Sequence, residues 1–259
     1  MKKSKFFDLL VVLLIVVAAA WLTVQFNWKG FYSIVAYFIV PAVYLCFREE
    51  KNYKKILAGT FIFGGLGGLP FDLLAQVNNI WTTSYSRFVF PQKIYGPTSI
   101  DYATFYFAFV FFITVFYEHF LDDEKKKTIS KNLPYALAFF IFAFALISVI
   151  YVFNPRLLIM PYEYLILGFV ATVPISGYML WRKPRLAPKM IKVGIFSFFV
   201  TLTAEITAMM TGQWEWPGQY IATISTFGLV FPVEEFIFWI FLGAPAIVAY
   251  YEFSADDEK

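Results

Sequence analysis

Phe231-Pro232-Val233-Glu234-Glu235-Phe236-Ile237-Phe238-Trp239-Ile240 places two adjacent carboxylates at the start of an apolar segment that continues to about Tyr251. A segment of about 20 apolar residues is long enough to cross the hydrocarbon core of a bilayer. Proline fits the first turn of a helix, and the helix dipole favours carboxylates there, so an ordinary acidic helix start explains part of the pattern. Acids at the mouth of a span are nevertheless costly, and such residues commonly carry function.

The composition excludes a soluble domain. Of the 259 residues, 60% are hydrophobic, 22% are aromatic and only 15% are charged, with a mean hydropathy of +0.65. These values predict an all-α polytopic membrane protein, and the net charge of +3 implies no nucleic-acid partner. One cysteine, Cys46, and one histidine, His119, allow no internal disulfide, histidine-based metal site or Ser-His-Asp triad, so we expect no bound metal.

Apolar windows of membrane-crossing length predict about eight transmembrane helices. They lie near residues 8–25, 31–47, 56–75, 102–120, 135–153, 162–181, 190–209 and 231–251. The first window follows a basic start and ends in small residues, so a cleaved signal peptide is an alternative reading of it. A span at 135–153 occupies the corresponding place in the second half of the chain and favours retention of the first.

The distribution of basic residues predicts the orientation in the cell membrane. With both termini in the cytoplasm, only Lys29, Arg87, Lys93 and Arg156 of the 21 Lys and Arg residues fall on the opposite side. This bias is typical of a multi-pass protein with an even number of spans. We expect the two long non-cytoplasmic loops, 76–101 and 210–230, to form short helices or re-entrant segments that roof the bundle.

The chain has an internal repeat at an offset of 133 positions, which predicts a first membrane repeat over 1–125 and a second over 126–259. The aligned pairs include Asp72 with Glu205, Trp81 with Trp214, Asp101 with Glu234, Phe105 with Phe238 and Tyr117 with Tyr250. The shared pattern is an acid, a tryptophan nine residues later, and a second acid twenty residues after that. Parallel repeats would bring both sets of acids to the same, non-cytoplasmic side.

The first of these acids follows a glycine-rich stretch. Gly64 and Gly68 are spaced so that a neighbouring backbone can approach closely, and Pro70 frees a carbonyl just before Asp72. Packing explains the glycines but not the carboxylate. In the second half, the corresponding helix offers hydroxyl groups and aromatic rings before Glu205.

These residues suggest proton chemistry in an apolar site. Burial favours the neutral form of a carboxyl group, and a second carboxylate beside it strengthens the effect, so a pair can hold and deliver a proton. The candidate catalytic residues are Glu234, Glu235, Glu205, Asp72 and Asp101. One of Glu234 and Glu235 would donate the proton, with Glu205 or the other as its electrostatic partner. Glu234→Gln is accordingly expected to lose turnover, and full activity in that variant would assign the donor role to Glu235 or Glu205.

Aromatic residues near the acids could stabilise a carbocation through the faces of their rings. The candidate substrate contacts are Trp214, Trp81, Phe238, Trp239 and Pro232, and Phe236 and Trp216 offer further rings. Aromatic residues in spans more often face lipid or fill the core, and interfacial tryptophan is common. The rings are therefore weaker candidates than the acids.

Glu205, Trp214 and Pro232-Val233-Glu234-Glu235, duplicated in outline within one small membrane protein, resemble the integral-membrane lycopene cyclases of the heterodimeric or fused two-module type. The resemblance implies a redox-neutral ring closure at the end of a linear carotenoid, with no cofactor. The chain also lacks the Gly-X-Gly-X-X-Gly motif of dinucleotide-binding folds. Two features depart from the family: the first half reads Thr98-Ser99-Ile100-Asp101-Tyr102 in place of the acidic motif, and each half has four spans rather than three.

Two other functions fit the same residues. A carotenoid end-group hydratase would use the same protonation but let water capture the cation. A proton-coupled transporter also combines repeated halves with acids in the membrane, but it needs a polar path to both surfaces. We expect acids in the spans only on the non-cytoplasmic side, which favours a one-sided pocket. A purely structural membrane subunit is the remaining reading.

The implied partners are a lipophilic polyene and membrane lipid, with a second copy of the chain or other carotenoid-pathway enzymes as further options.

Overall fold

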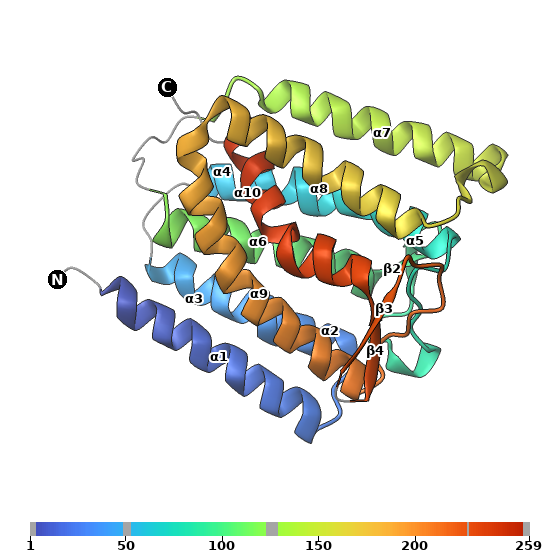
Figure 1. Ribbon diagram of the computed structural model, residues 1–259, viewed down its shortest axis with the longest axis horizontal. Coiled ribbons are helices and arrows are strands. Elements are labelled where there is room, and N and C mark those ends of the chain that lie inside the picture. The colour runs from blue at the N-terminus through green and yellow to red at the C-terminus, as the bar shows by residue number, and fades with distance from the viewer. Residues whose placement is uncertain (1–3, 49–52, 123–128, 227, 256–259) are drawn as a thin grey trace.

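Long helices running side by side form nearly the whole structure, a computed structural model that describes residues 4–48, 53–122, 129–226 and 228–255 (Figure 1). Seven helical segments are long and apolar enough to cross a membrane, and a bent pair makes an eighth candidate. The all-α polytopic fold predicted from the sequence is therefore confirmed. The candidate spans agree with the predicted windows to within a few residues.

The first half runs from α1 to α6. Its elements are α1 (Lys5–Gln25), α2 (Gly30–Ile34), η1 (Val35–Ile39), α3 (Val40–Arg48), α4 (Tyr53–Gly59), η2 (Thr60–Gly67), α5 (Gly68–Val77), η3 (Tyr85–Arg87), β1 (Lys93–Tyr95), β2 (Thr98–Ser99) and α6 (Ile100–Phe120). The segments α2–η1–α3 and α4–η2–α5 each form one continuous candidate span. Both contain a π-helical part, η1 and η2 respectively.

The second half runs from α7 to α10. Its elements are α7 (Leu133–Phe153), η4 (Pro155–Leu158), α8 (Glu163–Arg182), η5 (Pro184–Leu186), α9 (Ala187–Met210), β3 (Thr223–Thr226), β4 (Leu229–Pro232), η6 (Glu235–Phe241) and α10 (Gly243–Ser254). The last span is bent by 48° between the π-helical η6 and α10. The start of α1 and the end of α10 lie at one end of the bundle, here called the base, and the β-strands lie at the other, here called the roof (Figure 1).

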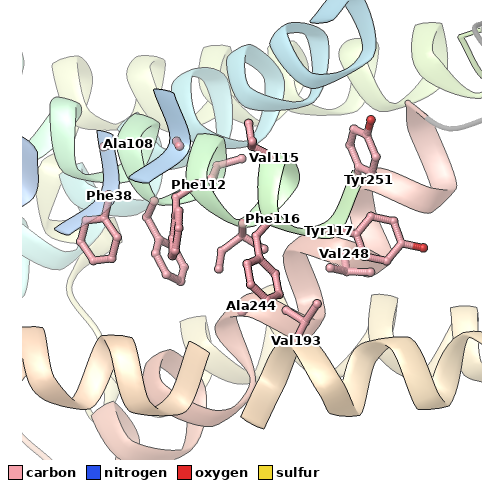
Figure 2. Packing of buried hydrophobic residues seen from close by; sticks show 14 of the residues in the cluster. Phe38, Ala108, Phe112, Val115, Phe116, Tyr117, Val193, Ala244, Val248 and Tyr251 are labelled. Atoms are coloured by element: carbon pink, nitrogen blue, oxygen red, sulfur yellow. The ribbon is translucent and has the colours of Figure 1, made fainter. Parts of the chain in front are cut away.

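The core surrounds α6, which is the most buried of the unbent spans. Figure 2 shows Phe112, Phe116 and Tyr117 of α6 among buried side chains of α9 and α10, including Val193 and Val248. In contrast, α7 is apolar on all sides and has one buried residue, Ala136. A helix that is apolar all round and still exposed is typical of one that faces lipid.

Close helix packing at the glycines is confirmed. A Cβ atom on Gly64 would lie 2.9 Å from the Cα atom of Phe107, and one on Gly68 would lie 2.6 Å from the Cβ atom of Tyr106. The absent side chains therefore let η2 and α5 lie directly against α6. The stretch before Asp72 is a π-helix that continues into α5.

The roof differs from the expectation of short helices or re-entrant segments. Apart from the single turn η3, the regular structure in the two loops consists of two antiparallel hairpins, β1–β2 and β3–β4. Gly96 and Gly228 take positive φ angles of 52° and 75° at the turns of these hairpins. Threonine in the strands and glycine in the turns favour a hairpin locally, so this prediction was wrong about the type of structure.

Contacts between the halves follow an approximate two-fold pattern. Thr82 and Glu215, which are 133 positions apart, exchange backbone hydrogen bonds of 3.0 and 2.8 Å. At the base, Tyr117 donates to Glu252 and Tyr251 donates to Glu118. These exchanged pairs are related by an offset of 134, so aligning Tyr117 with Tyr250 was wrong by one residue. A π-helix accommodates one extra residue, and η6 lies where the offset changes.

Acids also occur at the base, so the expectation that they lie only on the other side was wrong. Asp8 of α1 is fully buried, and its Oδ1 atom accepts hydrogen bonds from Tyr44 Oη at 2.8 Å and Arg48 Nε at 2.6 Å. His119 Nε2 lies 3.1 Å from the other oxygen. Glu118 and Glu252 are buried too. The placement of the acids therefore does not exclude a transport path.

Candidate functional site

A cavity of about 230 Å³ lies between the two halves of the bundle. Residues of η2, α5, α6, α7, α8, α9, η6 and α10 line it, and the roof loops cover it. Most of the lining is aromatic or small and apolar. Glu205 and Glu235 are two of its few ionisable residues, so the cavity combines an apolar wall with an acidic end.

The acidic end is a pair of carboxyl groups from two helices. Glu205 comes from the roof end of α9 and Glu235 from the first turn of η6, and both are more than 95% buried. Their carboxyl groups border the same end of the cavity and lie close enough to interact electrostatically. Two ionised carboxylates placed this close repel each other, so a proton on one of them would stabilise the pair.

Each member of the pair has a neutral hydrogen-bond donor. Trp214 Nε1 donates to Glu205 Oε1 at 2.9 Å, and the hydroxyl group of Tyr164 donates to Glu235 Oε2. In the second half, the spacing of nine residues between the acid and the tryptophan therefore lets the tryptophan donate a hydrogen bond to the acid. Tyr164, which follows Glu163 in the first turn of α8, was not among the predicted site residues.

Glu163 was missed as well, although it meets the criterion that selected the other acids. It is an acid at the roof end of a span, and only 2% of its surface is exposed. Neither of its carboxyl oxygens has a hydrogen-bond partner among the described residues. The other acids were selected because they belong to the repeat or to the Glu234-Glu235 pair. Glu163 belongs to neither and has no acidic counterpart in the first half.

Asp72 takes the equivalent place in the first half but forms a different site. It is fully buried, and its carboxylate faces the side chains of Thr98, Gln76 and Trp81 without a hydrogen bond of good geometry among the described residues. The residue at the position equivalent to Glu235 is Tyr102, which donates to Thr83 Oγ1 at 2.7 Å. The first half therefore has an acid and a tryptophan but no pair of acids.

Asp101 and Glu234 both hold the roof loops. Asp101 accepts backbone hydrogen bonds from Val89 at 2.8 Å and Phe90 at 2.9 Å. Glu234 Oε1 accepts one from Ile221 at 2.6 Å. Each carboxylate thus starts a span and binds a backbone amide 11 to 13 residues earlier in the chain. Asp101 also borders the cavity, whereas Glu234, Asp72 and Pro232 are not part of its described lining.

This geometry predicts that Glu234 matters for stability through its acceptor atom. Glu234→Ala would leave the Ile221 amide unpaired and is expected to lower stability by about 1–3 kcal/mol. Glu234→Gln keeps a carbonyl oxygen at the same place and should stay close to wild type. Thermal unfolding of both variants in the same detergent measures the difference. Equal unfolding temperatures for the alanine and glutamine variants would contradict the assignment.

Aromatic rings form the walls next to the acid pair. Trp81, Tyr164 and Trp216 are mutually in contact, with ring centroids 5.8 to 6.1 Å apart. On the facing wall, Trp239 lies 4.9 Å from Phe105 and 4.1 Å from Phe109. Phe238 fills the space that Gly168 leaves open, since a Cβ atom there would lie 2.4 Å from its ring. The predicted contacts Trp81, Trp214, Phe238 and Trp239 all line the cavity.

Pro232 and Tyr220 belong to the roof rather than to the wall. Pro232 is buried at the end of β4, opposite Thr223 of β3. Tyr220 donates to the carbonyl oxygen of Ile80 and accepts a hydrogen bond from the Gly218 amide at 3.0 Å. Burial raises the pKa of the Tyr220 phenol, so it stays neutral and links the two roof loops.

The fold and the site define a membrane-spanning α-helical protein with an internal apolar cavity and a buried acid pair. Comparison with family models, with curated proteins and with solved structures finds no significant match to this chain. The resemblance to membrane lycopene cyclases therefore still rests on the residues quoted from the sequence.

Proposed function

We propose that the protein is a membrane carotenoid cyclase that closes a ring at the end of a linear, lycopene-like polyene by proton-initiated, redox-neutral isomerisation. The observation that carries the proposal is the Glu205–Glu235 pair at the end of an apolar, aromatic cavity. A carboxylic acid held neutral in an apolar site can act as a general acid, and nearby rings stabilise the cation that results.

In the proposed reaction, Glu235 donates a proton to the terminal double bond of the polyene. The neighbouring alkene then attacks the tertiary cation and forms the ring, and loss of a proton restores a double bond. This proton returns to the acid pair, so the product has the same mass as the substrate and no oxidant is needed. Tyr164 and Trp214 would hold the pair in place through the bonds that they donate.

The site supports assigning the donor role to Glu235 rather than Glu234. Glu235 borders the cavity, contacts Glu205 and accepts from Tyr164. Glu234 instead holds the Ile221 amide in the roof. Adjacent residues on a helix point in directions about 100° apart, so two neighbouring acids reach different surroundings.

From the distribution of Lys and Arg residues, we propose that the base faces the cytoplasm. The four basic residues expected on the other side are in or near the roof: Lys29 Nζ, for example, donates to Phe88 O at 3.0 Å, and Arg87 Nη1 donates to Asn27 Oδ1 at 2.9 Å. The acid pair would then lie near the non-cytoplasmic surface. Fluorescent or enzymatic reporters fused to the C-terminus test this orientation.

The hydratase and the transporter remain as alternatives that one experiment can separate. The chain is expressed in bacteria that accumulate lycopene, and the pigments are extracted and analysed by mass and absorption. We expect an unchanged mass with a shifted absorption spectrum. A gain of one water would identify a hydratase, and recovery of lycopene alone would overturn the enzymatic proposal and leave the transporter to be tested by proton flux in vesicles.

A further inference from the structure

The cavity extends well beyond the acid pair, into a part that ring closure alone does not require. This far part is lined by Phe63 and Gly67 of η2, Phe140 of α7, Ala171 of α8 and Tyr250 of α10. The rings of Phe63, Phe140 and Tyr250 lie against one another, with centroids 5.2 to 5.8 Å apart. Within the described structure, these three rings form a cluster at the end opposite to Glu235.

The shape suits a linear molecule. The lining of the cavity runs from Glu235, at the roof end of the last span, to Tyr250 near the other end of that span. Yet the volume of the cavity is about 230 Å³. Pockets for compact, drug-sized ligands have volumes of about 300–1,000 Å³. A long cavity of small volume is narrow, so it fits a chain better than a compact molecule.

The helix α7 borders this narrow part on one side. Figure 1 shows α7 along one side of the structure, and its residues Phe139 and Phe142 are 61% and 66% exposed. Phe140 is half-buried and lines the cavity, so its ring forms part of the wall between the cavity and the surroundings. Gly67 makes room for that ring, since a Cβ atom on Gly67 would lie 3.0 Å from it.

We infer that the side chain of Phe140 controls access to a lateral entrance between α7 and its neighbouring helices. A linear polyene would pass through this entrance from the bilayer into the cavity. The inference rests on the proposed function, and it adds the route and the residue that controls it. A half-buried ring at the edge of the bundle can change rotamer with less repacking than a fully buried one. The reacting end would travel toward Glu235 while the rest of the chain trails along the aromatic wall.

The experiment follows access directly, without relying on turnover. Protein in liposomes is mixed with a linear alkyl chain that carries a terminal diazirine, and photolysis at successive times attaches the probe to nearby residues. Mass spectrometry then measures labelling at Thr172 and Ala246, which are buried residues of the cavity lining. Labelling of the lipid-facing surface of α1 serves as the internal standard.

Phe140→Ala is expected to raise the initial rate of labelling at Thr172 and Ala246 several-fold, and Phe140→Trp to lower it. Phe142→Ala is the matched control, because it removes a ring of the same helix that is 66% exposed and is not part of the described cavity lining; it should leave the rate unchanged. If Phe140→Ala does not fold, Phe140→Leu tests the same entrance with a smaller reduction in side-chain size. Thermal unfolding checks that each variant is folded.

The outcomes separate the entrance from the enzymatic proposal. Equal rates in the wild type, Phe140→Ala and Phe142→Ala, or no labelling of the lining in any of them, would overturn the entrance even if lycopene is converted. Conversely, Phe140-dependent labelling in a protein that leaves lycopene unchanged would support the entrance and overturn the cyclase activity.

Discussion

Glu235→Gln is expected to abolish ring formation in lycopene-accumulating cells while the protein remains folded. Glutamine keeps the size of the side chain and still accepts the hydrogen bond from Tyr164, but it has no proton that it can transfer to an alkene. Positioned general acids typically contribute about 10²–10⁴-fold to a rate, so the loss should be at least 100-fold. The measurement is the initial rate of product formation in isolated membranes, normalised to the amount of folded protein.

Two further variants show whether the pair acts as a unit. Glu205→Gln should also cause a large loss, because it removes the partner that Glu235 contacts. The double variant should be little worse than either single one, since residues that act together give non-additive effects. Glu234→Gln is the control on the same helix turn, and it should retain activity because its acceptor for the Ile221 amide is preserved. Loss of turnover in Glu234→Gln with full activity in Glu235→Gln would reverse the roles of the two residues.

Gly64→Leu is expected to have the largest effect on folding. A Cβ atom at this position would lie 2.9 Å from Phe107 Cα and 3.0 Å from Tyr106 O, which are backbone atoms of α6 and cannot rotate away. The substitution must push η2 from α6 and open the packing beside the cavity. Overpacking costs about 1–3 kcal/mol and occasionally more, and a backbone clash belongs at the upper end.

Gly177→Leu provides the matched control for this substitution. Gly177 also lies in a membrane-length helix, α8, but a Cβ atom there would meet no atom within 4 Å. Replacing an exposed helical glycine should be neutral or slightly stabilising, because glycine is a poor helix former. Thermal unfolding and the yield of monodisperse protein in detergent measure both variants. Similar unfolding temperatures for Gly64→Leu and Gly177→Leu would contradict the close approach of η2 and α6.

The spans could be predicted because the bilayer imposes a single requirement on each of them. A crossing helix needs about 20 apolar residues, and this length is visible in the sequence without any knowledge of packing. The glycine contacts with α6 were predicted for a similar reason, since small residues at helical spacing permit close approach. The hairpins of the roof were missed because loop residues satisfy their backbone groups in several ways, and composition does not decide between a short helix and two short strands.

The candidate site was predicted in part. Glu205, Trp214 and Trp81 were named from their positions in the repeat and Glu235 from the pair of adjacent acids, and all four line the cavity. The different roles of Glu234 and Glu235 could not be read from two adjacent letters, because the direction in which each side chain points depends on where the helix begins and on its π-helical turns. Tyr164 was missed because its hydrogen bond to Glu235 joins residues 71 positions apart.

Hydropathy and charge act on each segment separately, so the membrane class, the number of candidate spans and the set of acids worth testing could be read from the amino-acid sequence. Which of those acids meet depends on how the helices pack. Glu205 and Glu235 lie in contact while Glu234 and Asp101 hold the roof, and Asp8, Glu118 and Glu252 form buried contacts at the base. The physical reason is that hydrogen bonding between carboxyl groups and their donors acts over about 3 Å, and only the packing of helices distant in sequence brings atoms that close.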